Sequence, residues 1–376
     1  ILMGWAVYKK NVSIVVVTTI SFTLTLLAVW FGTRLPIIDL DLDQWKAILL
    51  IYSFAASVLP VWLLLQPRDY INSLLLYLGL AAIFFGFFLL QPEFAAPAVQ
   101  SHPKGAPPLF PFVFVIIACG AVSGFHGLVS SGTTAKQINK ETDATFIGYG
   151  GMIGESLLGL VSVLACTAGF LTQDLWMEHY SSWENAQGLG TNMKAFINGS
   201  ALFLHQLGIP IEIAKAFVAV IAISFALTTL DSATRLLRFN ISEMGETVGL
   251  SSLSNRYIAS GTAVTVIGAF SFYQVGGQTA GLALWQLFGT TNQILGGLTL
   301  LTVTLYLIQK KRPYWPTALP MGFMLITTLV AMIIKLKDFW SKEANLLLFL
   351  GSGIFLLSIW LTAEAILRII KSQQSN

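Results

Sequence analysis

The sequence is poor in charged residues. Lys, Arg, Asp and Glu make up 10% of the 376 residues, whereas hydrophobic residues make up 55%. Soluble domains carry roughly 25% charged residues, so this chain has too little polar surface to cover itself in water. Its net charge of +3 is too small and too dispersed to indicate a nucleic-acid partner. The composition therefore predicts a polytopic membrane protein.

The sequence also lacks the motifs of common catalytic and metal-binding sites. Its two cysteines, Cys119 and Cys166, lie in apolar runs, where a cysteine acts as a small buried hydrophobe, so we expect neither a disulfide nor a metal site. Nothing resembles the phosphate-binding loop that ATP-driven transport would need. We expect no enzyme and no cofactor. The ionisable pair His126 and Glu155 keeps an intramembrane enzyme as an alternative, beside a non-transporting sensor or scaffold.

The chain contains many apolar runs that are long enough to cross a membrane. A helix needs about 20 residues to cross a bilayer core of about 30 Å. Ten such spans follow a short helical stub at residues 1–8, which predicts an all-α polytopic transmembrane bundle. Because Ile1 is not an initiator methionine, we expect an N-terminal part of the protein to be missing. The expected spans are 12–31, 45–65, 70–90, 112–131, 147–170, 211–230, 257–275, 284–308, 316–334 and 346–368.

Polar and proline-rich stretches separate groups of these spans. Residues 91–111 form a proline-rich connection, and residues 171–195 form a polar loop. The amphipathic segment 196–207 is expected to lie at the membrane interface. The expected divisions are a membrane domain at 1–170, an extracytoplasmic loop with an interfacial segment at 171–210, and a C-terminal transmembrane region at 211–376.

The distribution of Lys and Arg predicts the orientation, because cytoplasmic loops carry an excess of these residues. If the spans alternate from a cytoplasmic Lys9, 13 of the 21 Lys and Arg residues fall on the cytoplasmic side. The C-terminus is then cytoplasmic. The cytoplasmic set is Lys9, Lys10, Arg68, Lys136, Lys140, Arg235, Arg238, Arg256, Lys310, Lys311, Arg312, Arg368 and Lys371.

The stretch 111–150 contains the most unusual of the expected spans, because glycine, serine and histidine interrupt its apolar run. In hydrocarbon every backbone N–H and C=O needs a partner within the protein. Broken helices with hydroxyl side chains form transporter binding sites, whereas small-residue faces also serve to pack helices, and both interpretations stay open. We expect the regular helix to break between Ser123 and Gly132. The candidate residues are Ser123, Gly124, His126, Ser130, Ser131, Thr133 and Thr134.

Two ionisable residues lie within expected spans. A histidine imidazole can take up and release a proton under physiological conditions, so His126 can carry a proton or bind a carboxylate. Glu155 lies about 12 Å into its span, at 1.5 Å per helical residue. Because ionisable groups inside a membrane are costly, they tend to mark pathways. We expect both residues to face one cavity and to carry substrate or proton; structural hydrogen bonding is the alternative for each.

Two further clusters are candidates. Thr228, Thr229, Asp231 and Ser232 resemble the hydroxyl-lined cation site of sodium-coupled transporters; alternatively, Asp231 pairs with Arg235 one helical turn away. The uncharged amides Asn292 and Gln293 lie within another span, where they either line the same cavity or bind two helices together.

A charged pair follows Pro67. Arg68 and Asp69 are expected in a tight cytoplasmic turn, where Arg68 supplies one positive-inside charge. The alternative is that the two residues contribute to a salt bridge that gates the protein.

Five strings in the sequence carry a family resemblance. They are LPVWLLLQPRDY at 59–70, ACGAVSGFHGLVSSGTT at 118–134, FIGYGGMIGES at 146–156, ALTTLDSATR at 226–235 and LWQLFGTTNQ at 284–293. In their order and spacing, across nearly the whole chain, they resemble the carbon starvation protein A family of bacterial membrane proteins.

This resemblance implies both function and fold. Family members are described as peptide transporters induced on carbon starvation, and related members take up pyruvate with protons. It therefore implies a proton-coupled secondary transporter in the bacterial inner membrane, with a peptide or small carboxylate as substrate. The family is grouped with the amino acid–polyamine–organocation transporters, whose LeuT-like fold has two inverted five-helix repeats. The resemblance implies that the family's N-terminal helices, including a glycine-rich HHFAAIAGAGP-like segment, are missing here; that segment would be the symmetry mate of residues 112–131.

Overall fold

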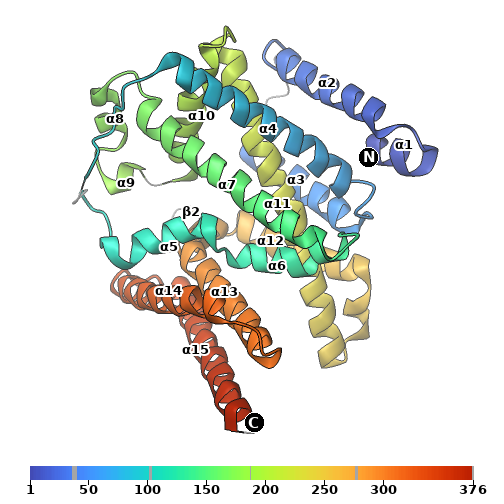
Figure 1. Cartoon of the computed structure of the whole chain (residues 1–376), viewed down its shortest axis with the longest axis vertical. Helices are drawn as coiled ribbons and strands as arrows, with labels where there is room; N and C mark the ends of the chain where they lie inside the picture. Colours follow the sequence, from blue (N-terminus) through green and yellow to red (C-terminus); the bar gives the residue numbers. More distant parts are fainter. Residues whose placement is uncertain (36–39, 101–103, 187, 276–277, 375–376) are drawn as a thin grey trace. The chain divides into compact units, whose positions relative to one another are not determined.

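The computed structural model describes the chain except for residues 36–39, 101–103, 187, 276–277 and 375–376. The regular secondary structure of the described chain is helical except for one β-hairpin, whose two strands have two residues each (Figure 1). This confirms the all-α prediction. The helices are α1 (Leu2–Lys10), α2 (Ile14–Gly32), α3 (Leu42–Val58), α4 (Leu65–Leu90), α5 (Leu109–Ala121), α6 (Gly124–Gly132), α7 (Asp143–Ala168), α8 (Gln173–His179), α9 (Trp183–Ala186), α10 (Leu189–His205), α11 (Ile211–Val248), α12 (Arg256–Phe272), α13 (Ala280–Gln309), α14 (Trp315–Ser341) and α15 (Asn345–Gln374). The hairpin pairs β1 (Gln274–Val275) with β2 (Gln278–Thr279).

Eight membrane-length apolar segments are found within the described residues. One of them, Leu109–Lys136, comprises α5, α6 and the short 3₁₀ turn that follows. The expected spans 45–65 and 257–275 form α3 and α12, which have 17 residues each. Such helices are about 25 Å long, somewhat less than the bilayer core. Pro60 ends the first of them early, because the residue before a proline is disfavoured in a helix. The structure therefore shows a polytopic helical protein.

The chain forms two compact units that do not follow chain order. The first unit comprises residues 1–106 and 153–268, and the second comprises residues 107–152 and 269–376. Each unit is described by itself. The division expected at residues 170 and 210 concerns the position of segments relative to the membrane, which these units do not test.

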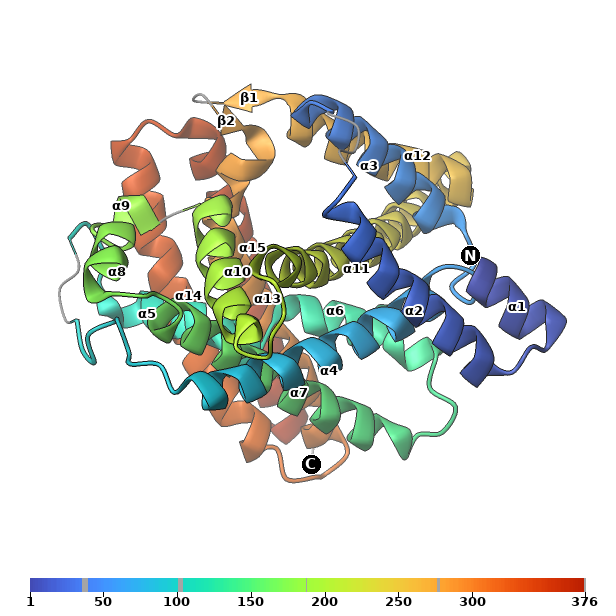
Figure 2. The same ribbon diagram turned by 90° about the horizontal axis from the view of Figure 1, so that it is seen from above.

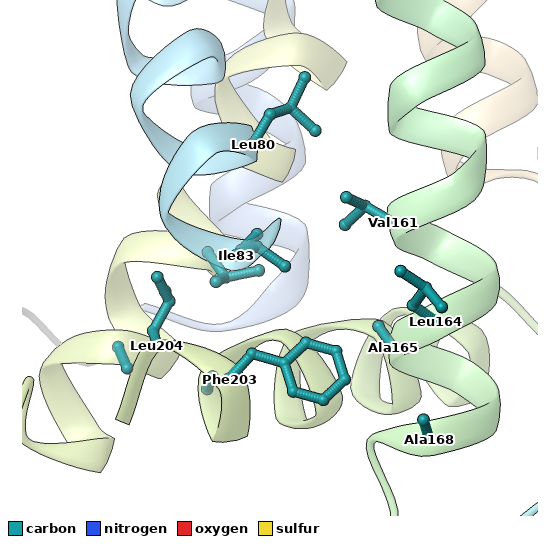
Figure 3. Packing of buried hydrophobic residues seen from close by; sticks show 11 residues of the cluster. Leu80, Ile83, Val161, Leu164, Ala165, Ala168, Phe203 and Leu204 are labelled. Carbon is teal, nitrogen blue, oxygen red and sulfur yellow. The ribbon is translucent and has the colours of Figure 1, made fainter. Parts of the chain in front are cut away.

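The core of the first unit lies where α4, α7, α10 and α11 meet. Figure 3 shows Phe203 of α10 with its ring directed toward Ala165 of α7, beside Ile83 of α4. The Phe203 ring also packs edge-on against Phe87, with 5.4 Å between ring centroids. Most of segment 196–207, expected at the interface, lies in the longer helix α10 (Leu189–His205), which buries one face. Figure 2 shows a second contact of this unit, α3 alongside α12, where the Ser57 and Ser260 hydroxyls are 2.7 Å apart.

Helix α4 approaches α10 so closely that Gly86 has no room for a side chain. A Cβ at this position would collide with the Phe203 carbonyl group. We expect Gly86→Ala to destabilise the protein by about 1–3 kcal/mol, because the two helices must move apart. Gly159→Ala is the matched control, since a Cβ there would meet nothing within 4 Å. Thermal unfolding of the detergent-purified variants measures both, and equal unfolding temperatures would contradict the packing.

The second unit is built around α13, which packs against α5, α6, α14 and α15. Its apolar core contains Leu287 and Ile294 of α13, Met332 and Phe339 of α14, and Leu347 of α15. Figure 1 shows α13, α14 and α15 packed together, and α5 and α6 as successive teal helices. Phe112 and Val115 of α5 form a smaller buried cluster with Ala331 of α14. This packing places the break between α5 and α6 against α13.

Candidate functional site

The helix of the central stretch is broken as predicted. Helix α5 ends at Ala121 and α6 begins at Gly124, and the two residues between them are extended. Val122 has φ −142° and ψ 92°, and Ser123 has φ −105° and ψ 135°. Such a break frees carbonyl groups at the end of α5 and N–H groups at the start of α6, and within a membrane these groups need new partners.

Asn292 of α13 supplies one set of partners. Its Oδ1 accepts a hydrogen bond from the backbone N–H of Phe125 at 2.9 Å, in the first turn of α6. Its Nδ2 donates to the Ser123 hydroxyl at 3.0 Å. Nδ2 also lies 3.6 Å from the Cys119 sulfur. One buried amide therefore caps the start of α6 from a neighbouring helix.

Gln293 serves the other side of the break. With its amide oriented to match donors with acceptors, Nε2 donates to the Val122 carbonyl at 2.5 Å and Oε1 accepts from the Cys119 N–H at 2.7 Å. The Gln293 side chain is completely buried. Consecutive amides on α13 thus satisfy both ends of the interruption, as expected of side chains that bind two helices together. Whether they also line a cavity stays a prediction.

Gly124 allows this close approach. A Cβ on Gly124 would collide with the Asn292 carbonyl oxygen and lie 2.8 Å from the Gly296 nitrogen. Gly296 is tight in return, because its own Cβ would lie 3.1 Å from the Val122 oxygen. Gly124 is therefore required by the close contact with the α13 backbone, and Gly296 lies tightly against the break from the other side.

The other hydroxyl candidates lie along α6 and just beyond it. The Ser130 and Ser131 hydroxyls donate to the Gly127 carbonyl of their own helix, at 2.9 and 3.1 Å. Thr133 follows the end of α6, and its hydroxyl is buried without a hydrogen-bond partner in the described structure. Thr134 begins a 3₁₀ turn that ends at Lys136. A transport role for these hydroxyls stays a prediction.

His126 and Glu155 lie in different compact units. His126 is on α6 in the second unit, and Glu155 is on the part of α7 that belongs to the first. The prediction that they face one cavity therefore stays a prediction.

The first unit contains a buried cluster of charges that centres on Asp231. This side chain is fully buried on α11, and its Oδ2 forms an ion pair with Nη1 of Arg68 from α4. The Tyr52 hydroxyl of α3 donates to the same Oδ2 at 2.9 Å, and Arg68 Nη1 lies 2.6 Å from that hydroxyl. The other oxygen, Oδ1, is buried without a partner in the described structure. Three helices therefore meet at one carboxylate oxygen.

A more exposed group of polar side chains adjoins this cluster. Asp69 lies 3.2 Å from Arg68 Nη2, and its side chain is 42% exposed. The Thr228 hydroxyl is within hydrogen-bonding reach of Asp69. Asn72 donates to the Thr228 hydroxyl at 3.0 Å. The structure thus brings the predicted candidates Thr228 and Asp231 together with a group on α4.

Two expectations about these residues are corrected. Arg68 and Asp69 lie near the N-terminal end of α4, not in a turn between helices, because the helix already begins at Leu65. Asp231 is paired with Arg68, not with Arg235. Arg235 instead donates to the carbonyls of Ala56 at 2.6 Å and Leu59 at 2.9 Å. These carbonyls belong to the C-terminal end of α3, which attracts positive charge.

The candidate cation site lies on a regular helix. Helix α11 runs unbroken through residues 228–232. The Thr228 and Thr229 hydroxyls both donate to carbonyls one turn earlier, at 3.0 Å. No cluster of three or more His, Cys, Asp or Glu ligands is found among the described residues. The cation site of Thr228, Thr229, Asp231 and Ser232 stays a prediction.

Sequence reasoning missed Tyr52 and Asn72. Each is a single polar residue in an apolar run, and each bonds to α11 from more than 150 positions away. The sequence offered one signal for them. A lone polar side chain in a membrane span is energetically costly, so each of these residues needs a partner.

The comparison with known proteins decides the family. The model of the family described as "Carbon starvation protein CstA" matches residues 1–185 and 177–331. The chain belongs to this family. No solved structure matches it.

Several curated relatives are similar over most of this chain. The "Peptide transporter CstA" of Campylobacter jejuni is 32% identical over 87% of this chain and 54% of its own length. The protein of the same name from Escherichia coli is 33% identical, over 80% of this chain and 50% of its own length. The E. coli "Pyruvate/proton symporter BtsT" is 31% identical, over 76% and 50%. All three are named as transporters, and the chain spans about half their length.

Proposed function

We propose that this chain is part of a secondary active transporter that takes up peptides or a small carboxylate such as pyruvate, driven by protons, during carbon starvation. The names of its relatives support this, since they include peptide transporters and a pyruvate/proton symporter. The structural observation that carries the proposal is the broken membrane helix between α5 and α6, capped from α13 by Asn292 and Gln293. A packing helix needs no such break.

The break suits an anionic substrate. The start of α6 is the positive end of a half-helix, and such ends bind carboxylates in transporters that are built on broken helices. Ser123, Gly124 and His126 all lie at this end. We place this transporter in a LeuT-like fold with ten spans. That protein lies in the bacterial inner membrane with its C-terminus in the cytoplasm.

Uptake by the reconstituted protein of full natural length tests the proposal. Proteoliposomes should accumulate radiolabelled pyruvate or a labelled dipeptide when the outside is acidic, and should lose most of that accumulation when the pH gradient is collapsed. An intramembrane enzyme would convert the label without accumulating it. A sensor or scaffold would do neither, and either outcome would refute transport.

Glu155→Gln is expected to abolish proton-driven uptake while leaving substrate exchange close to wild type. Exchange needs no net proton movement, whereas driven uptake needs a group that carries the proton. His126→Ala should instead weaken the binding of an anionic substrate. Glu246→Gln, an exposed carboxylate near the end of α11, is the control and should behave as wild type. Normal driven uptake by both site variants would leave the pair with a structural role only.

A further inference from the structure

Arg68 forms ion pairs with two carboxylates that differ greatly in burial. Asp231 is fully buried and shares one oxygen between Arg68 and Tyr52. Asp69 is 42% exposed, meets Arg68 through one contact of 3.2 Å to Nη2, and has the Thr228 hydroxyl within hydrogen-bonding reach. An ion pair whose carboxylate is partly in solvent contributes little to stability. Asp69 can therefore leave Arg68 at small cost, whereas Asp231 cannot.

The edge of the Arg68 guanidinium group that faces Asp69 makes fewer hydrogen bonds than it could. Nη1 is committed to Asp231 and Tyr52, and Nη2 reaches Asp69. Nε is buried without a hydrogen-bond partner in the described structure. Nε and Nη2 form one planar edge with two parallel donors, which is the geometry that binds a carboxylate with two hydrogen bonds. Asp69 makes a single contact on this edge.

The group around Arg68 is polar on several sides. The Tyr52 hydroxyl lies 2.6 Å from Arg68 Nη1. The Asn72 amide donates to the Thr228 hydroxyl at 3.0 Å. Arg235 and Arg238 follow Asp231 on α11, and their guanidinium groups donate to carbonyls at the end of α3.

We propose that Arg68 is a carboxylate-binding residue, and that the carboxylate of a substrate displaces Asp69 from the Nε–Nη2 edge while Asp231 keeps its place. This rests on the proposed function and names a second recognition site for the same substrates. Arg68 is about 5 Å from the start of α4, at the end that the Lys and Arg distribution assigns to the cytoplasm. The site thus lies where an imported substrate leaves.

The test uses the reconstituted protein of full natural length and the cytoplasmic-side half-saturation concentration for pyruvate, measured in counterflow. Asp69→Asn should lower this concentration about threefold to fivefold, because it removes an exposed competitor worth up to about 1 kcal/mol. Asp69→Glu, which keeps the competing charge, should stay close to wild type. Arg68→Lys should raise the concentration about tenfold or more, because an ammonium group cannot make the paired contact. Pyruvamide, which lacks the carboxylate, should respond to none of these changes.

The improvement in Asp69→Asn is the deciding result, since misfolding cannot produce tighter binding. Unchanged or weaker pyruvate binding in this variant, with normal uptake by the wild type, would overturn this inference and leave the proposed function standing. A wild-type protein that neither transports pyruvate or dipeptide nor is thermally stabilised by them would overturn both.

Discussion

Replacing Arg68 with glutamine is expected to lower the free energy of unfolding by about 3–5 kcal/mol, the usual cost of leaving one partner of a buried ion pair unpaired. Asp231 is fully buried, and Tyr52 would be the sole remaining donor to its carboxylate in the described structure. Unfolding of the purified protein, titrated with denaturing detergent and followed by tryptophan fluorescence, measures the loss.

The double variant Arg68→Gln with Asp231→Asn separates a charge effect from lost packing. Removing both charges should recover most of the stability, because no unpaired charge then stays buried. Lys342→Gln is the control, since its ion pair with Asp338 at 2.9 Å is exposed on both sides and should contribute little. A double variant as unstable as Arg68→Gln would show that the pair contributes through shape and not through charge.

Replacing Asn292 with leucine should destabilise the second unit by about 2–3 kcal/mol, because leucine has a similar size but cannot accept the Phe125 N–H. That N–H and the Ser123 hydroxyl both bond to Asn292. In a site without water the orphaned N–H has no substitute partner. We also expect uptake to fall further than the amount of folded protein does, because the start of α6 loses its fixed position.

Thr302→Val is the matched control for Asn292→Leu. Thr302 lies on the same helix, and its hydroxyl donates at 3.0 Å to the Leu298 carbonyl of that helix. Its replacement should change stability and uptake only slightly. Equal effects of the two substitutions, in unfolding and in uptake, would contradict the capping role of Asn292.

The helix break could be predicted from sequence because its cause is local. Ser123 and Gly124 are weak helix formers, and their place within an apolar run is visible without any partner. The polar pair Asn292–Gln293 could also be recognised in the sequence. Whether these amides line a cavity or bind a neighbouring helix, however, depends on which segment packs against them. The structure supplies that partner, the opened backbone at Val122 and Phe125.

The partner of Asp231 could not be predicted in the same way. Local reasoning favours Arg235, four residues further along the helix, because such pairs lie on one face. The actual partner, Arg68, is 163 residues away and reaches Asp231 only because α4 packs against α11. Arg235 is drawn instead to the free carbonyls at the end of α3, which exist because Pro60 stops that helix early. Long-range packing thus decided both pairings.

Proton movement that accompanies substrate entry tests the central claim most directly. Proteoliposomes that contain the protein of full natural length and a trapped pH-sensitive dye should acidify inside when pyruvate or a dipeptide is added outside, with no pH gradient imposed beforehand. A proton-coupled transporter predicts acidification that saturates with substrate and is lost in Glu155→Gln. Substrate entry without any internal pH change, or with the same change in Glu155→Gln, would contradict the account.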